Sequence, residues 1–180
     1  MILLALPMDE SKGWQNTIPV TSPKCYLTGL PALNLPAPEG TTGESNFMSV
    51  FYDINKSGKK LNLQLAGEAQ VLNTNHIYGE YGIYECSEGM RKLGLYIPEE
   101  IAAVYAANHY RAILDLLYDS LRTHQQVLGL TGTTEEWLDT PEQKVLVLEK
   151  AAQMFPFLSE PESEELRRWI EKERQPGYWS

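Results

Sequence analysis

The residues with the clearest chemical potential lie in a polar stripe along an otherwise apolar segment. Its members recur at helical spacing, and they are Asn108, Arg111, Asp115, Asp119 and Arg122. The four-residue spacing of Arg111 and Asp115 allows an ion pair along one helix face, as does the three-residue spacing of Asp119 and Arg122. An exposed stripe would be a solvated face, whereas a buried one would be a hydrogen-bonded network or a reactive site. The pattern favours a structural role.

His109 lies beside this stripe but on a more apolar face, near Ala102, Tyr105 and Leu116. A histidine in such surroundings is more often a hydrogen-bonded core residue than a general base, and we interpret it that way. Arg111, Asp115 and His109 are nevertheless the candidate catalytic residues that the sequence offers.

A loop rich in glycine and hydroxyl groups precedes this region at residues 40–46. Its candidate ligand-binding residues are Gly40, Thr41, Thr42, Gly43 and Ser45. Successive backbone N–H groups in such a loop can cradle an anion. A phosphate-binding loop, however, needs a lysine after its second glycine, and Glu44 stands there instead. We therefore expect a structured turn, with ligand contact as the alternative.

Residues 53–58 imitate the first half of a calcium loop, with oxygen-bearing side chains at positions one, three and five and glycine at six. Gln64 occupies the position that requires a bidentate glutamate, and Lys59 and Lys60 add positive charge. We reject calcium binding on these grounds. The cysteines and histidines show no ligand spacing, so we expect no metal site and no cofactor.

Two further groups of side chains suit contact with another protein. Tyr78 and Tyr81 lie in a short aromatic segment with glycines between them, although a strand packed under helices explains the same pattern. Glu162, Glu164 and Glu165 cluster at the start of the last predicted helix. We expect these acids to be exposed and available to a partner.

Charge is unevenly distributed along the 180 residues, whose formal net charge is −9. Residues 1–97 hold nine acidic and seven basic side chains, and residues 98–180 hold fifteen and eight. Such a surface repels nucleic-acid phosphates and attracts a basic protein. No apolar run approaches the ~20 residues of a membrane span. Two cysteines suit a reducing compartment, so we expect free, buried thiols and a cytoplasmic protein.

Hydrophobic spacing and turn residues predict an α+β fold, with an antiparallel β-rich half over 1–97 packed against a helical bundle over 98–180, as one integrated domain. The first half is expected to contain strands at Ile2–Leu6, Thr17–Thr21 and Cys25–Thr28, a hairpin over 46–65, further strand near 77–84 and a short helix near 87–94. The second half is expected to contain helices over about 99–121, 140–155 and 161–174.

Two functions fit this pattern. The first is an acidic protein-binding module that engages a basic partner, as an inhibitor, an antitoxin-like protein or an accessory subunit does. The second is a small enzyme or ligand-binding protein with its site between the Gly40–Asn46 loop and the stripe of Asn108, Arg111 and Asp115. The charge asymmetry favours the first.

Overall fold

The computed structural model describes residues 13–175 and contains helices together with a mixed sheet. The described strands are three residues long: β1 Cys25–Leu27, β2 Leu65–Gly67, β3 Ile83–Glu85 and β4 Tyr105–Ala107. They lie in the order β2-β1-β4-β3, with β1 and β4 parallel and the outer pairs antiparallel. The α+β class is confirmed, but the predicted antiparallel sheet is wrong: the sheet is mixed, and its strand β4 comes from the half that was predicted to be helical.

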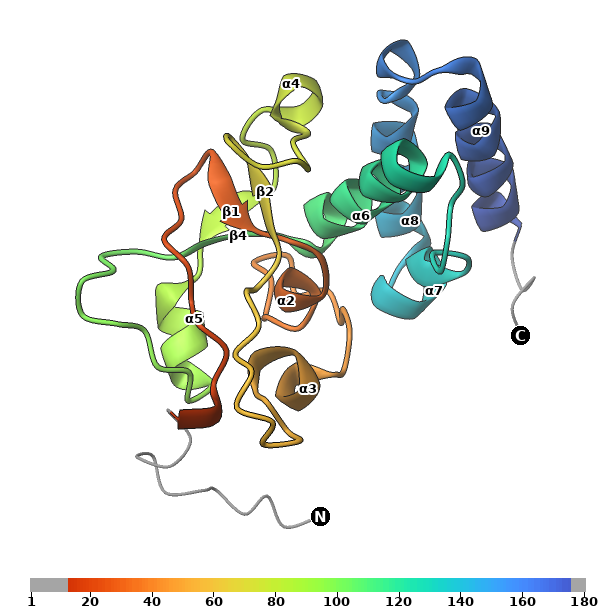
Figure 1. Cartoon of the computed structure of the whole chain (residues 1–180). Helices are drawn as coiled ribbons and strands as arrows, with labels where there is room; N and C mark the ends of the chain where they lie inside the picture. The colour runs from red at the N-terminus through yellow and green to blue at the C-terminus, as the bar shows by residue number, and fades with distance from the viewer. Residues whose placement is uncertain (1–12, 176–180) are drawn as a thin grey trace.

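Helices account for most of the remaining regular structure (Figure 1). They are α2 Gly29–Leu33, α3 Phe47–Phe51, α4 Asn75–Tyr78, α5 Ser87–Lys92, α6 His109–His124, α7 Thr133–Trp137, α8 Pro141–Ala152, the 3₁₀ helix η1 Phe155–Phe157 and α9 Glu160–Arg174. Helices α2, α3 and α5 lie on the sheet side of the molecule, and α7, α8 and α9 lie together on the other side. Helix α6 starts at the sheet and runs into the helical group.

Helix α6 organises the larger of two hydrophobic clusters. Leu114, Leu117 and Leu121 are completely buried there, together with side chains from the sheet and from α8 and α9. The second cluster lies within the sheet half and includes Leu27 and Phe51. Helix α6 packs against side chains of the sheet and against α8 and α9, so it joins the sheet to the helical bundle.

The predicted helix over about 99–121 is wrong in its first ten residues. Tyr105–Ala107 pairs with β1 and β3 as strand β4, and Asn108 then caps α6 by accepting the backbone N–H of Arg111 at 2.9 Å. The alanine-rich run before Asn108 fits either a strand or a helix, and pairing with two strands selects the strand. Asparagine also favours the N-cap over a helix interior.

The predicted hairpin over 46–65 is also wrong. Its first arm is the helical turn α3, in which the N–H of Tyr52 donates to the carbonyl of Met48 at 3.0 Å. The second arm does not pair with the first: Tyr52 and Asn62 form isolated bridges to Gln15 and Thr17, and Leu65 begins β2, which pairs with β1. Burial of Phe51 against the sheet half outweighs the β propensity of this aromatic segment.

Other elements were predicted with mixed success. The strand at Cys25–Thr28, the short helix near 87–94 and the last two helices are confirmed. Residues 77–84 form the end of α4, a turn and the start of β3, and Thr17–Thr21 contributes only the isolated bridge of Thr17. The strand predicted at Ile2–Leu6 lies outside the described residues. Within the described part of the chain, no helix has the length and apolarity needed to cross a membrane.

Candidate functional site

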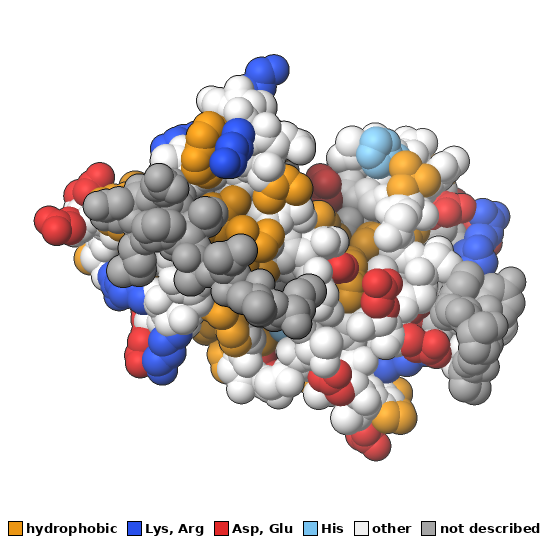
Figure 2. All heavy atoms as spheres, turned by 90° about the horizontal axis from the view of Figure 1, so that it is seen from below, with side chains coloured by type: hydrophobic (Ala, Val, Ile, Leu, Met, Phe, Trp, Pro, Cys, Tyr) orange, Lys and Arg blue, Asp and Glu red, His pale blue; other side chains and the backbone are white. Residues whose placement is uncertain are grey.

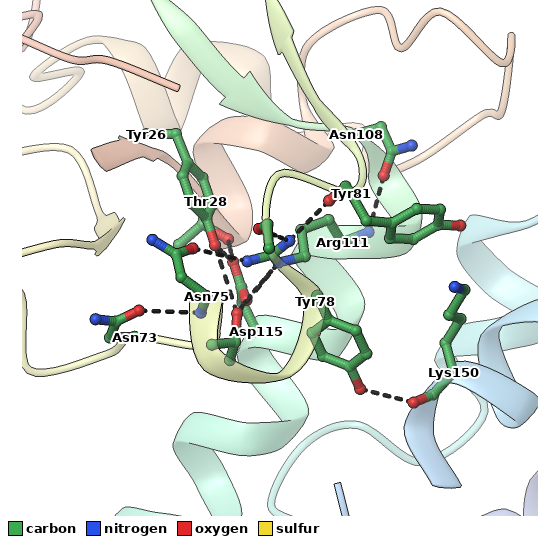
Figure 3. Close-up of polar contacts among 12 residues, drawn as sticks. Tyr26, Thr28, Asn73, Asn75, Tyr78, Tyr81, Asn108, Arg111, Asp115 and Lys150 are labelled. Atoms are coloured by element: carbon green, nitrogen blue, oxygen red, sulfur yellow. Dashed lines mark hydrogen bonds and ion pairs between the residues drawn. The ribbon is translucent and has the colours of Figure 1, made fainter. Parts of the chain in front are cut away.

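The predicted pairing of Arg111 with Asp115 is confirmed, and the pair is completely buried (Figure 3). Arg111 Nε lies 3.3 Å from Asp115 Oδ1 and also donates to Thr74 Oγ1 at 3.1 Å. The guanidinium also donates to the carbonyls of Gly79 and Tyr81 and to the side-chain oxygen of Asn75, over 2.7–3.0 Å. The donors of Arg111 are therefore directed at the chain around α4.

Asp115 accepts from side chains of the sheet and of the segment before α4. Tyr26 and Thr28 donate their hydroxyl groups to Oδ2 at 3.0 and 2.7 Å, and Thr74 donates to Oδ1 at 2.5 Å. Burial raises the pKa of Asp115, whereas Arg111 and the hydroxyl donors act in the opposite direction. The four donors around the carboxylate favour its ionised form, in which every lone-pair direction is used.

This network is a structural junction. It ties α6 to β1 and to the chain that leads through α4, and Figure 3 shows these side chains converging from those elements. Among residues 13–175, no buried side-chain nitrogen or oxygen lacks a hydrogen-bond partner. Since Arg111 and Asp115 have no solvent exposure and satisfied partners, the geometry favours a structural over a catalytic role for them.

The other end of the stripe behaves differently from the prediction. Arg122 does not pair with Asp119 but with Glu162 at the start of α9, at 2.9 Å. Asp119 instead accepts from the hydroxyl of Thr123. Asn108 caps α6 and donates its amide to Glu39 at 2.5 Å, next to Gly40.

His109 is a core histidine with both ring nitrogens in use. Its Nε2 lies 2.8 Å from the carbonyl oxygen of Leu35, which can only accept, so Nε2 carries the proton. Its Nδ1 then accepts from the hydroxyl of Thr41 at 2.5 Å. Burial lowers the pKa of His109 below its usual value, and the hydrogen bond to Leu35 opposes this. The ring is neutral and fixes the loop to α6.

The Gly40–Asn46 loop is held by hydrogen bonds to the rest of the protein. Thr42 donates its N–H and its hydroxyl to Asp139, and the N–H of Gly43 donates to the carbonyl of Trp137. Trp137 in turn donates its indole N–H to Glu44 at 2.7 Å. These backbone N–H groups donate to other parts of the protein, so they are not free to bind an anionic ligand. The loop lies close to His109 and to the N-cap residue Asn108. Arg111 is instead directed toward the chain around α4, and Asp115 toward Tyr26, Thr28 and Thr74.

The end of the loop does border a surface hollow. Ser45 and Asn46 line a depression of about 480 Å³ together with α3 and Ile54. Met48 and Ile54 are both more than half exposed there. Of the predicted ligand-binding residues, Ser45 is the one that lies at this hollow, whereas Thr41 and Gly43 are buried.

The predicted partner-binding tyrosines are occupied within the molecule. Tyr78 is 7% exposed, and its hydroxyl donates to the carbonyl of Lys150 on α8 at 2.7 Å. Tyr81 is partly buried, with the ammonium of Lys150 4.2 Å from its ring centre. Both tyrosines therefore connect the chain around α4 to α8.

The predicted exposure of Glu162 is wrong, because this side chain is 3% exposed. It completes a capping box with Ser159, whose N–H donates to it at 2.7 Å, and it accepts from Arg122. Glu164 and Glu165 are partly exposed, but they pair with Arg167 and Arg168 one turn later. The three predicted acids are thus paired within the molecule.

The imitation calcium loop is organised by its own chain. The carboxylate of Asp53 accepts from the hydroxyl of Ser57 at 3.0 Å and from the N–H of Gly58 at 2.9 Å. Within residues 13–175 there is no group of three or more His, Cys, Asp or Glu side chains that could hold a metal ion.

A second hollow, which sequence reasoning missed, lies between α7 and α8. It has a volume of about 380 Å³. Its lining residues are Thr134, Glu135, Leu138, Asp139, Thr140, Pro141, Lys144, Val145, Leu148 and Arg174. Nothing in the sequence signalled it, because the spacing of Val145 and Leu148 predicts that both face the core, whereas Val145 is 53% exposed in the structure.

Comparison with known protein families, with curated proteins and with solved structures finds no match for this chain. Functional inference therefore rests on the geometry described above.

Proposed function

We propose that this protein is an acidic binding module that engages a basic protein through the face formed by α7 and α8. The observation that carries the proposal is the exposure of the acidic side chains on this face. Residues 133–150 contain five acidic and two basic side chains. The acids, Glu135, Glu136, Asp139, Glu142 and Glu149, are all exposed.

Of the five acids, Glu135 is the one that pairs with a lysine of this segment. Lys144 lies 3.0 Å from Glu135, and its side chain is only 15% exposed. Lys150 stacks on the ring of Tyr81 at the junction with α4. Both cations are thus engaged within the molecule, while Glu136, Glu142 and Glu149 remain on the surface.

Acidic and apolar side chains alternate along the outward face of α8. Glu142, Val145, Glu149 and Ala152 follow each other at spacings of three and four residues, and all four are exposed. Acidic groups therefore flank an apolar position along one helix face. Acidic side chains are visible across the helical side of the face drawn in Figure 2.

Complementary charge speeds the encounter between proteins and is screened by salt. A partner recognised in this way would present lysines and arginines on a surface that matches α8. This supports the role of an inhibitor, an antitoxin-like protein or an accessory subunit for a basic protein. It also moves the proposed contact to α7 and α8, because Glu162, Glu164 and Glu165 of α9 are paired within the molecule.

Charge reversal on α8 tests the proposal. A partner is first recovered with the wild-type chain from the native host, and its binding kinetics are then measured at low and high salt. The double variant Glu142→Lys/Glu149→Lys should lower the association rate on the order of tenfold at low salt and much less at high salt. Helix stability should change little, because one substitution opposes the helix dipole and the other favours it.

The matched control is Glu99→Lys/Glu100→Lys, which changes the net charge equally at exposed positions before β4. This control should have a small effect on association. Equal effects of the two double variants would show that net charge alone matters and would count against the α8 face. Failure to recover any basic partner would count against the proposal as a whole.

The ligand-binding alternative is supported by one observation, the hollow of about 480 Å³ beside Ser45. It does not extend to Arg111 and Asp115, so the alternative reduces to a surface site at α3. Ser45→Trp would obstruct that hollow. A small molecule that raises the melting temperature of the wild-type protein but not of this variant would favour the alternative, provided that binding of a partner at α8 is unchanged.

A further inference from the structure

The hollow between α7 and α8 has an apolar interior. Leu138, Pro141, Val145 and Leu148 contribute to its lining. Leu138 and Leu148 belong to the buried core at its base, whereas Val145 is 53% exposed at its edge. Its volume of about 380 Å³ is at the lower end of the range for ligand pockets, and it can accommodate one large side chain.

Some of the charged groups near the hollow are neutralised within the molecule, and others are not. Lys144 and Glu135 neutralise each other at 3.0 Å. Asp139 accepts from the N–H and hydroxyl of Thr42, which are neutral donors, so its negative charge has no cationic partner in these contacts. Glu142 lies outside the lining and is exposed in the first turn of α8, next to the lining residue Pro141, and Arg174 lines the hollow from the end of α9.

This combination differs from a typical small-molecule site. Such sites combine an apolar lining with a few convergent polar groups that fix the orientation of the ligand. Here several polar lining side chains are already engaged within the molecule: Thr134 donates its hydroxyl to the buried carboxylate of Glu173, Glu135 pairs with Lys144, and Thr140 caps α8. An apolar hollow with a polar edge instead resembles the centre of a protein interface, where one anchoring side chain is surrounded by weaker contacts.

We propose that the hollow receives a single large apolar side chain from the basic partner, and that a lysine or arginine near that anchor lies against Asp139 or Glu142. This inference rests on the proposed function and specifies the chemistry of its partner. The recognised segment therefore combines one apolar anchor with adjacent positive charge. Complementary charge speeds the encounter and helps to select the partner, and the buried anchor supplies most of the binding energy.

A displayed library of random peptides provides the probe, selected against the full-length protein. Enriched peptides should share one large apolar residue within a few positions of lysine or arginine. Val145→Gln removes the apolar edge without changing charge and should weaken these peptides by about tenfold, as expected for loss of a central contact. Leu128→Gln is the matched control, since Leu128 is 51% exposed, lies outside the hollow and should have no effect.

The outcomes separate this inference from the proposed function. Basic peptides that share no apolar residue, that ignore Val145→Gln and that weaken with Glu142→Lys/Glu149→Lys would overturn the anchor while supporting the acidic face. Peptides that ignore both variants would overturn both ideas. Enrichment of no basic peptide would overturn the anchor, and the kinetics of the recovered protein partner would then decide the proposed function separately.

Discussion

Arg111 Nε lies 3.3 Å from Asp115 Oδ1, one turn along α6, and neither side chain is exposed to solvent. An ion pair on a helix surface contributes little, whereas removal of one member of a buried pair leaves an uncompensated charge. The pair connects α6 to Tyr26 and Thr28 of the sheet side and to Asn75 of α4. The sheet and the helical bundle are therefore coupled through one network.

Breaking this pair should destabilise the whole protein. Asp115→Ala and Arg111→Met should each lower the free energy of unfolding by about 3–5 kcal/mol. The double variant should lose less than the sum of the two, because no charge is then left without its partner. Urea unfolding of the three variants measures this coupling. Strictly additive losses would contradict the assignment of a single network.

The acids at the start of α9 should differ in their importance for stability. Although burial raises the pKa of Glu162, the Ser159 hydrogen bonds and Arg122 outweigh it and lower the pKa below its usual value. Glu162→Lys should cost about 1–3 kcal/mol, since it leaves these donors without an acceptor. Glu164→Lys, at a side chain that is 46% exposed, should change stability by no more than about 0.5 kcal/mol. Comparable losses in thermal unfolding would refute this distinction.

His109 should make stability depend on pH in a defined direction. Its pKa is lowered in the folded protein from a model-peptide value of 6.5, chiefly by burial. As pH falls below that value, the unfolded chain takes up a proton that the folded protein resists, so the free energy of unfolding decreases. Well above pH 6.5 the histidine is neutral in both the folded and the unfolded chain, so it no longer lowers the free energy of unfolding.

His109→Gln removes the titrating group and should flatten the dependence between about pH 7.5 and 5.5, where histidine titrates. The variant should also be less stable throughout, because Thr41 and Leu35 lose well-placed partners. Chemical denaturation at a series of pH values tests both effects. An unchanged slope in the variant would assign the pH dependence to other groups.

The two cysteines should react with thiol reagents at very different rates. Burial, assisted by the Glu85 carboxylate, raises the pKa of Cys86 to about 12, and its side chain is 5% exposed. Cys25 is a free, partly exposed thiol. Since the thiolate is the reactive form, a chromogenic disulfide should titrate Cys25 in the native protein and Cys86 only after unfolding. Rapid reaction of both thiols in Cys25-intact protein, or of any thiol in Cys25→Ser, would contradict this.

Features that depend on neighbouring residues in the chain were predictable from the sequence. Thr140 and Pro141 predict the start of α8, and in the structure Thr140 caps this helix by accepting the backbone N–H of Gln143. Spacing alone predicts that Arg111 can reach Asp115, and apolar periodicity places Leu117 in the core. Helix caps and pairs one turn apart involve local contacts, so a short stretch of sequence carries the information.

Tertiary structure decided the features that depend on distant partners. Residues 105–107 become a strand because β1 and β3 lie on either side, and Phe47–Phe51 becomes helical as Phe51 packs into the sheet-side core. Glu162 is buried because Arg122 approaches from α6, 40 residues earlier. The hollow exists only where α7, α8 and the end of α9 meet. Each outcome depends on burial and pairing between segments far apart in the chain, which local propensity does not encode.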